Sequence, residues 1–217
     1  MIYETIGIIV LGYLMGSIPF GLVIGKLRRG IDIREYGSGN IGFTNVLRTV
    51  GVREGIATLL GDIAKGAVPA VLGGVIVGSN TADVGGLTYD QQGAQAVGAI
   101  AAVIGHNWSI YLKFQGGKGV DTSLGGLLAM SPFVGLGCLV IGIAVIASTR
   151  YVSLGSIVGA CCGVIILAPL VVLDYEVIEY LGYAVVVAVL IIIRHKDNIE
   201  RLKAGTESKI GQKGEKK

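Results

Sequence analysis

The stretch Ser153–Leu173 reads SLGSIVGACCGVIILAPLVVL and carries no charged residue. It is as long as the roughly 20 apolar residues that a helix needs to cross the hydrocarbon core of a bilayer. The whole chain agrees, because 52% of its 217 residues are hydrophobic and 15% are charged, whereas a typical soluble domain carries about 25% charged residues. The sequence therefore predicts an all-α, polytopic membrane protein.

Apolar runs recur along the chain and predict seven transmembrane helices. The predicted spans are 3–25, 54–78, 93–112, 120–130, 133–148, 153–173 and 177–194. The span 120–130 is short, because a helix rises only about 1.5 Å per residue, and Ser131-Pro132 favours a break after it. A half-helix of this kind is tolerated only where protein or a water-filled cavity surrounds it.

Charged residues divide the loops into two sets. The basic residues fall in 26–53, in 113–118, at Arg150 and from Arg194 onward, with Lys65 as the exception inside a span. In the loops before the third and the seventh spans, all the charged residues are acidic. Seven crossings place all the basic loops on one face, and the positive-inside rule makes that face cytoplasmic. We therefore expect the N-terminus outside and the C-terminus in the cytoplasm, whereas six crossings would separate the basic tail from the first basic loop.

The chain divides into one domain and a tail. Residues 1–202 are expected to form a single integral membrane domain. Residues 203–217 are basic and rich in Gly, Lys and Glu, a composition that predicts a mobile cytoplasmic tail.

Gly116-Gly117-Lys118-Gly119 is a compact anion-binding motif between apolar segments. Glycines let backbone N–H groups approach a phosphate closely, while the lysine ammonium neutralises its charge. The spacing is not that of a Walker A loop, because Leu112 stands where the first glycine belongs and Gly119 follows the lysine in place of Ser or Thr. A nest for a smaller phosphate group therefore fits better than a nucleoside triphosphate site.

A second polar motif spans residues 37–48 and reads GSGNIGFTNVLR. Ser38 or Asn40 would cap a helix that begins just after it. On that helix Thr44 and Arg48 are four residues apart and share a face, with Asn45 beside them. An exposed helix N-terminus next to an arginine is an anion site in outline. The alternative is a capped amphipathic connector without a ligand.

Polar residues also occur within or beside later spans. Asp62 and Lys65 lie three apart inside the second span, where a lone charge costs at least about 2.5–3.5 kcal/mol and marks a functional site by default. The alternative is a structural ion pair that locks two helices, or a Lys65 that extends toward the loop site. Ser153 opens the sixth span, and His195 and Asn198 share a helical face at the end of the seventh.

Together these motifs resemble the bacterial membrane acyl-phosphate:glycerol-3-phosphate acyltransferase family (PlsY). The resemblance rests on Ser38-Gly39-Asn40-x-Gly42-x-x-Asn45-x-x-Arg48, on Asp62-x-x-Lys65-Gly66, on Gly105-His106 followed by Phe114-x-Gly116-Gly117-Lys118-Gly119-Val120, and on Arg194-His195-x-x-Asn198-Ile199-x-Arg201-Leu202. Four ordered motifs are far more specific than any one of them. The sequence departs from the family pattern at Phe43, Ser109, Gln115 and Asp121, where Ala, Pro, Lys and Ala are usual.

The resemblance implies a reaction and the residues that carry it. A fatty acyl group would pass from acyl phosphate to the 1-hydroxyl of sn-glycerol 3-phosphate, giving lysophosphatidic acid and phosphate for phospholipid biosynthesis. The implied catalytic residues are His195, Lys118, Arg48 and Asn198, and the implied substrate-binding residues are Ser38, Asn40, Thr44, Asn45, Lys65, Gly116, Gly117, Gly119 and Ser153. The general base stays open between His195 and the substrate's own phosphate.

The resemblance also implies partners and a location. The partners would be the two substrates, membrane lipid and, through coupling, the enzyme that makes acyl phosphate. No cofactor, metal ion or nucleic acid is expected. The protein would be a multi-pass protein of the bacterial inner (plasma) membrane, with its active site on the cytoplasmic face.

A membrane transporter of a phosphorylated metabolite is the alternative function. Intramembrane Asp62 and Lys65 and a broken helix would suit a transporter. The polar motifs, however, gather on one predicted face of the membrane. Alternating access would have no matching site on the other face, so the acyltransferase is the preferred interpretation.

Overall fold

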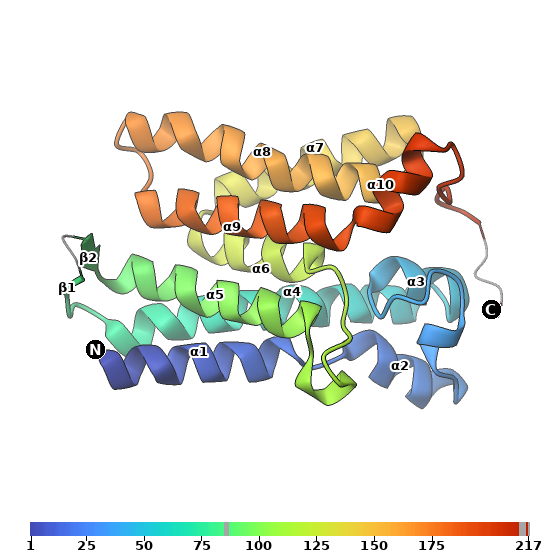
Figure 1. The fold of residues 1–217 in the computed structure, drawn as a ribbon, viewed down its shortest axis with the longest axis horizontal. Helices are drawn as coiled ribbons and strands as arrows, with labels where there is room; N and C mark the ends of the chain where they lie inside the picture. The colour runs from blue at the N-terminus through green and yellow to red at the C-terminus, as the bar shows by residue number, and fades with distance from the viewer. Residues whose placement is uncertain (85–86, 213–215, 217) are drawn as a thin grey trace.

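The computed structural model describes residues 1–84, 87–212 and 216, and within them the chain is almost entirely helical (Figure 1). The helices are α1 (Ile2–Gly16), α2 (Phe20–Arg29), α3 (Phe43–Thr49), α4 (Val52–Val77), α5 (Gln91–Asn107), α6 (Val120–Met130), α7 (Pro132–Thr149), α8 (Val152–Val172), α9 (Ile178–Arg194) and α10 (Lys196–Lys203). Short 3-10 turns occupy Ile33–Glu35 and Ile110–Leu112. Strands β1 (Ala82–Val84) and β2 (Leu87–Tyr89) form an antiparallel hairpin before α5, which the all-α expectation did not include.

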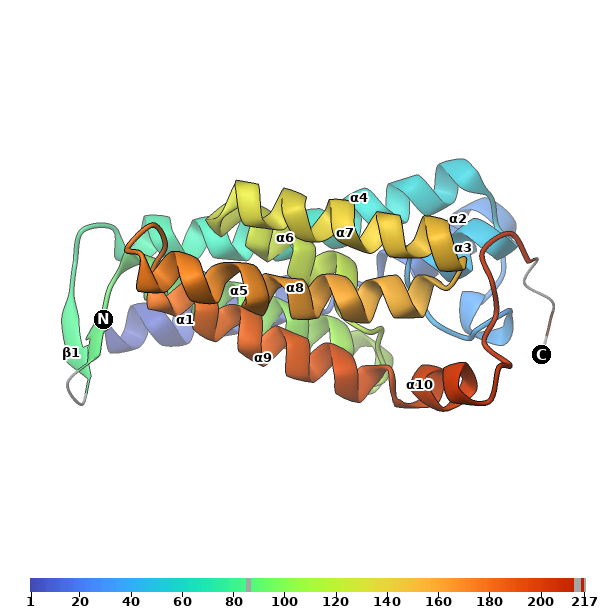
Figure 2. The ribbon, with the colours of Figure 1, turned by 90° about the horizontal axis from the view of Figure 1, so that it is seen from above.

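The long helices run side by side along one axis (Figures 1 and 2). Helices α1, α4 and α5 pack against one another, and α7, α8 and α9 pack in chain order. Helix α6 contacts α4, α5, α7 and α9, so the short helix lies between the two groups. One end of the bundle carries the N-terminus, the hairpin and the α8–α9 turn, and the other end carries α2, α3 and α10. We call the second the site end.

The outer surface of the bundle suits a membrane. Among the described residues, four segments are long and apolar enough to cross a bilayer: Ile2–Arg29, Val52–Val77, Pro132–Thr149 and Val152–Val172. The pair α9 and α10, bent by 61°, makes a fifth if it counts as one span. Large apolar side chains face outward, among them Phe133, which is 90% exposed. The chain is a multi-pass membrane protein, while α5 and α6 are shorter than these spans.

The first predicted span, 3–25, lies within one apolar segment, Ile2–Arg29, which a break divides into two helices. Helix α1 ends at Gly16 and α2 begins at Phe20, because Pro19 lacks an N–H group and interrupts the helical hydrogen bonds. The Ile18 carbonyl accepts a hydrogen bond from Lys65 Nζ at 2.8 Å. The Ser17 carbonyl accepts one from Ser109 Oγ at 2.6 Å. Polar side chains thus satisfy backbone carbonyls at the break, as the membrane interior requires.

Glycines set the closeness of helix packing. A Cβ added at Gly66 would lie 1.8 Å from the carbonyl oxygen of Thr122, so α4 and α6 touch backbone to backbone. A Cβ at Gly16 would lie 2.1 Å from the carbonyl oxygen of Ala102, and α1 meets α5 in the same way. Small residues at such crossings are typical of membrane helix bundles. The short α6 is therefore held by direct contact with α4.

Candidate active site

A cavity of about 1180 Å³ lies at the site end and extends into the bundle. Its polar end is lined by the loop before α3, by the start of α6 and α8, and by residues from His195 onward. Its other part, which we call the apolar arm, lies between α6, α7, α8 and α9 and is lined mostly by Leu, Ile, Val, Ala and Gly, with Cys138 and Tyr183 at its inner end. One continuous space thus joins a polar end to a hydrocarbon-like interior.

Asn45 organises the loop before α3. Its side-chain nitrogen donates to the carbonyl oxygens of Ile33, Tyr36 and Asn40 at 2.8–3.1 Å, and its side-chain oxygen accepts from the Ser38 N–H at 3.0 Å. These bonds use the amide fully, and the residue is buried. Asn45 therefore lines the cavity as the residue that shapes the loop, and it presents Ser38 and Asn40 to the cavity.

Arg48 extends from α3 into the cavity. One terminal nitrogen, Nη2, donates to the Lys209 carbonyl oxygen at 3.0 Å. Its Nε is buried and has no hydrogen-bond partner among the described residues. A buried donor without a partner costs about 1–3 kcal/mol. Arg48 therefore offers a charged donor to a ligand, and Thr44 lies one turn before it on the same helix.

The glycine loop differs in part from its prediction. The Gly117 N–H donates to the His106 carbonyl oxygen at 2.9 Å, and Arg194 donates to the carbonyl oxygens of Gly116 and Gly117. A Cβ at Gly117 would lie 2.0 Å from His106 Nε2. These two glycines do not line the cavity. The Gly117 N–H is thus already paired, donation from Gly116 to substrate stays a prediction, and both glycines let the loop pack on His106.

The second half of the loop faces the cavity. Gly119 lines it in a left-handed conformation, with φ of +79°, and α6 begins at the next residue. The N–H groups at the start of a helix favour an anion. Lys118 lines the same part, and its ammonium donates to the side-chain oxygen of Asn198. Burial lowers the pKa of Lys118 to about 8, and Glu207 nearby opposes that shift.

His195 is a neutral imidazole in the cavity wall. Burial lowers its pKa to about 4, and the Lys118 charge acts in the same direction. Its Nδ1 lies 2.8 Å from the Ile191 carbonyl oxygen. A carbonyl only accepts, so Nδ1 carries the hydrogen and Nε2 keeps its lone pair. The side chain can therefore accept a hydrogen bond from a hydroxyl group through Nε2.

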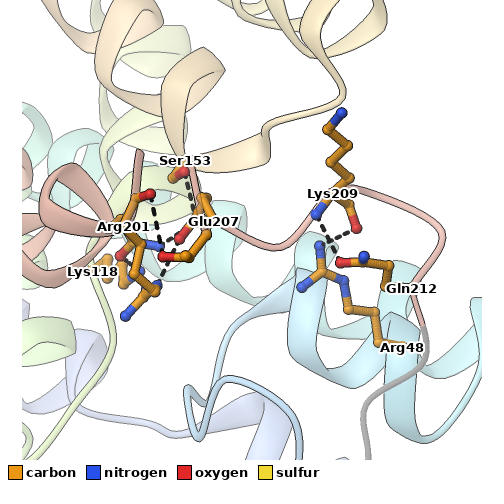
Figure 3. A network of polar contacts seen from close by, with 9 residues as sticks. Arg48, Lys118, Ser153, Arg201, Glu207, Lys209 and Gln212 are labelled. Atoms are coloured by element: carbon orange, nitrogen blue, oxygen red, sulfur yellow. Dashed lines mark hydrogen bonds and ion pairs between the residues drawn. The ribbon is translucent and has the colours of Figure 1, made fainter. Parts of the chain in front are cut away.

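Glu207 closes the polar end, and Figure 3 shows its contacts. Its carboxylate accepts from Ser153 Oγ at 2.8 Å, from Asn198 Nδ2 at 2.6 Å and from Arg201 Nε at 2.7 Å. Burial alone would raise its pKa, but these hydrogen bonds hold the pKa below the ordinary value. The network Lys118–Asn198–Glu207 therefore joins the glycine loop, α8 and α10 through one buried carboxylate.

The segment that carries Glu207 was predicted to be a mobile tail. In the structure Lys203 still belongs to α10, and the Ile210 N–H donates to the Arg150 carbonyl oxygen at 2.8 Å. Arg150 in turn donates to the Ile210 carbonyl oxygen at 3.1 Å. Residues 206–210 thus have a docked position against the cavity. Mobility stays a prediction, and residues 213–215 and 217 lie outside the described residues.

Replacing Glu207 with Gln is expected to lower the melting temperature and to raise KM for the phosphate-bearing acceptor. The amide would present N–H groups to Asn198 or Arg201, and a buried donor left unpaired costs about 1–3 kcal/mol. Thermal unfolding in detergent and steady-state kinetics measure the two effects. Glu200→Gln is the matched control, because Glu200 is exposed on α10. Unchanged melting temperature and KM in Glu207→Gln would contradict this role.

Lys65 does not line the cavity, and its contact with substrate stays a prediction. Its ammonium donates to Asp62 at 2.8 Å and to the Ile18 carbonyl oxygen, and both charged side chains are buried. Phe20 also covers the ammonium, at 5.8 Å from the ring centre. The alternative of a structural ion pair therefore describes Lys65 better, since it clamps the break between α1 and α2.

Most of the predicted site residues meet in the cavity although they come from distant parts of the chain. Those that line it are Ser38, Asn40, Thr44, Asn45, Arg48, Lys118, Gly119, Ser153, His195 and Asn198. Lys65, Gly116 and Gly117 do not. Within the described part of the chain, no group of three His, Cys, Asp or Glu side chains is placed to hold a metal ion.

Comparison with known sequences shows the family to which this chain belongs. A sequence model described as glycerol-3-phosphate acyltransferase matches residues 6–205. The chain belongs to the glycerol-3-phosphate acyltransferase family. A family member from Clostridioides difficile is 44% identical over 214 residues, covering 99% of each chain. One from Geobacter sulfurreducens is 46% identical over 199 residues, covering 91% of this chain and 93% of that protein.

Solved structures of the family have the same fold. The crystal structure of PlsY, an integral membrane glycerol 3-phosphate acyltransferase, in its glycerol 3-phosphate form aligns with a TM-score of 0.82. The two sequences are 36% identical, and the alignment covers 95% of this chain and 96% of that one. The lysophosphatidic acid form of PlsY aligns with a TM-score of 0.81 at 35% identity, over 95% of each chain.

Sequence reasoning missed two contributors to the site of this acyltransferase. Glu207 lies in the predicted tail, and the family motif that contains Arg201 gives it no role. No local pattern singled out Glu207, because a glutamate among Gly, Lys and Ser looks like solvent-exposed sequence. Arg201 follows Asn198 by three residues on α10, and that spacing could have placed the two side chains on one face.

Proposed function

We propose that the cavity is the site where this acyltransferase joins two phosphate-bearing substrates. A fatty acyl group moves from acyl phosphate to the 1-hydroxyl of sn-glycerol 3-phosphate, and the products are lysophosphatidic acid and inorganic phosphate. The observation that carries the proposal is the continuity between a cationic polar end and an apolar arm. A donor with a charged head and an alkyl tail fits such a space.

The acceptor phosphate is placed between Arg48 and Lys118. The unpartnered Nε of Arg48 and the ammonium of Lys118 both line the polar end. Ser38 and Asn198 line the same part of the cavity. Hydrogen bonds between such cations and a phosphate are about twice as strong as neutral ones. This set holds the head of glycerol 3-phosphate and leaves its 1-hydroxyl free to turn toward the donor.

The donor phosphate is placed at Gly119 and the first turn of α6. The helix N-terminus favours an anion there, and Lys118 adds a charge. The acyl chain then follows α6 into the apolar arm, past Leu124 and Leu127. This placement sets the donor's carbonyl carbon beside the polar end, where the acceptor hydroxyl lies.

The chemical step exchanges one bond for another. The 1-hydroxyl oxygen attacks the acyl carbonyl carbon, the bond from that carbon to the phosphate oxygen breaks, and phosphate leaves with its electron pair. Because acyl phosphate is already activated, no covalent enzyme intermediate is required. Holding two reactants in line can supply about 7–11 kcal/mol of the barrier. The hydroxyl proton passes either to His195 Nε2 or to a phosphate oxygen of the substrate.

The charge distribution of the bundle supports a cytoplasmic site and seven crossings. Arg150 and the basic residues of α2, α3 and α10 lie at the site end. The acidic residues Asp83, Asp174 and Glu176 lie in the loops of the opposite end (Figure 1). By the positive-inside rule the site end faces the cytoplasm, with the N-terminus outside, in a bacterial inner membrane. The enzyme that makes acyl phosphate would supply the donor from that side.

The deciding experiment is acylation by the purified protein. Labelled glycerol 3-phosphate and palmitoyl phosphate in detergent should give labelled lysophosphatidic acid, whereas palmitoyl-CoA and palmitoyl acyl carrier protein should not serve as donors. Absence of product with all three donors would reject the proposal. Uptake of glycerol 3-phosphate into proteoliposomes without acylation would support the transporter instead.

A further inference from the structure

The apolar arm has a closed end deep in the bundle. On each of its four helices the residues that line the cavity stop at one level: Leu128 on α6, Cys138 on α7, Gly163 on α8 and Tyr183 on α9. On α8 the lining runs from Ser153 to Gly163, a depth of about 15 Å at 1.5 Å per residue. Past this level the interior is packed, with Met130, Val134, Leu167 and Tyr180 buried in the core.

Gly163 occupies the point where the other three helices approach α8. A Cβ added there would lie 3.7 Å from Cys138 Sγ on α7, 3.8 Å from Ala184 Cβ on α9 and 3.8 Å from Leu127 Cδ2 on α6. These are ordinary van der Waals distances, so a methyl group fits without moving a neighbour. The position therefore has room for a side chain in a packed surrounding, and it borders the end of the cavity.

The other α8 glycines in the wall differ from Gly163. A Cβ at Gly155 would lie 2.4 Å from a side-chain carbon of Ile146 and 2.6 Å from the Gly142 carbonyl oxygen, so that glycine is needed for α7–α8 packing. A Cβ at Gly159 would lie 3.2 Å from the Cys138 carbonyl oxygen. Of these three glycines, Gly163 alone can take a methyl group without a steric conflict. A methyl group there leaves the helix crossing intact, and a longer side chain would occupy the end of the cavity.

We propose that Gly163, together with Cys138, forms the floor that sets the longest acyl chain this enzyme uses efficiently. The inference rests on the proposed function, because it takes the apolar arm as the acyl site. A chain that reaches Gly163 fills the arm. A longer chain must displace packed core side chains or leave its end outside the arm, and interiors packed like crystals resist such displacement. One methylene in a hydrophobic pocket changes specificity by about 10–200-fold.

The test is a chain-length profile of Gly163→Leu. Rates would be measured with saturated acyl phosphates from octanoyl to stearoyl. We expect the ratio of lauroyl to octanoyl kcat/KM to fall by at least about tenfold, with KM for glycerol 3-phosphate unchanged. Gly163→Ala, whose methyl fits, should shift the profile less and guards against misfolding of the leucine variant. Gly182→Ala is the control, because nothing lies within 4 Å of a Cβ at that glycine. A Gly163→Leu profile that matches the parent would overturn the proposal.

Cys138 provides a second readout that does not depend on turnover. In a variant with Cys161 and Cys162 replaced by alanine, a small thiol reagent should modify Cys138 from the cavity. Lauroyl lysophosphatidic acid should protect the thiol, whereas the octanoyl form should not. Equal protection by both would also overturn the proposal. Protection by the long chain in a protein that acylates nothing would leave the floor supported and reject the acyltransferase reaction, so the two failures are distinguishable.

Discussion

Replacing Lys118 with alanine is expected to lower kcat/KM for glycerol 3-phosphate by about 10³-fold, the upper range for loss of one preorganised charged donor. The ammonium lines the cavity between the glycine loop and α10, and it bonds Asn198, which Glu207 holds in turn. Its removal takes a positive charge from the place where two phosphates meet. The fold should survive, because the side chain is only half-buried and α6 packs on α4 without it. Circular dichroism and melting temperature check the fold.

The pH dependence gives this prediction a sharper form. Burial lowers the pKa of Lys118 to about 8. The ammonium is therefore present below that pH and is lost as pH rises through it, so kcat/KM for glycerol 3-phosphate should fall above about pH 8. Lys118→Arg should move this alkaline limb beyond the accessible range, because a guanidinium keeps its proton.

Lys113 provides the matched control for Lys118. It lies on the same loop, is exposed and does not line the cavity. Lys113→Ala should keep both the rate and the alkaline limb. If Lys113→Ala and Lys118→Ala lost kcat/KM by the same factor, the positive charges of this loop would act only through general attraction of anions. An unfolded Lys118→Ala protein would mean that the lysine is structural.

The local sequence predicts much of this fold, because the length of an apolar run indicates the length of the membrane helix. The run 120–130 was expected as a short helix, and α6 has those bounds. The first span was expected too, but not the break inside it at 17–19, which Lys65 and Ser109 from distant segments stabilise. Pro19 indicates the break in the local sequence. The hydrogen bonds to the Ser17 and Ile18 carbonyl oxygens, however, come from residues far along the chain, so a short stretch of sequence does not predict them.

The candidate site was predictable where one motif carries several polar residues, as in 37–48. It was not predictable where the role depends on a partner. From the sequence alone Lys65 is a candidate for binding substrate, but in the structure its ammonium bonds Asp62 and the Ile18 carbonyl oxygen. Gly117 looks like a donor until His106 takes its N–H. From the sequence alone Glu207 belongs to a solvent-exposed tail, but in the structure its carboxylate accepts hydrogen bonds from three side chains of α8 and α10.

Replacing His195 with alanine is expected to lower kcat by about 10²-fold or more, the range for loss of a positioned acid–base group. The Nδ1–H is held by the Ile191 carbonyl, so Nε2 faces the cavity as an acceptor. His195→Gln is the companion variant, because its amide oxygen can accept a hydrogen bond and cannot take up a proton at neutral pH. Substantial activity in His195→Gln would indicate that the imidazole orients the hydroxyl without removing its proton.

The acidic limb of the pH profile separates the two candidate bases. Burial lowers the pKa of His195 to about 4, so the neutral imidazole persists down to that pH and gives no limb near neutrality. The second pKa of a phosphate ester is about 6, and a substrate phosphate that accepts the proton should lose activity as pH falls through 6. We therefore expect the limb near pH 6 to remain in His195→Ala at its reduced rate. If the parent instead shows a limb near pH 4 that His195→Ala removes, and none near pH 6, the proton passes to His195 and the substrate-base hypothesis is rejected.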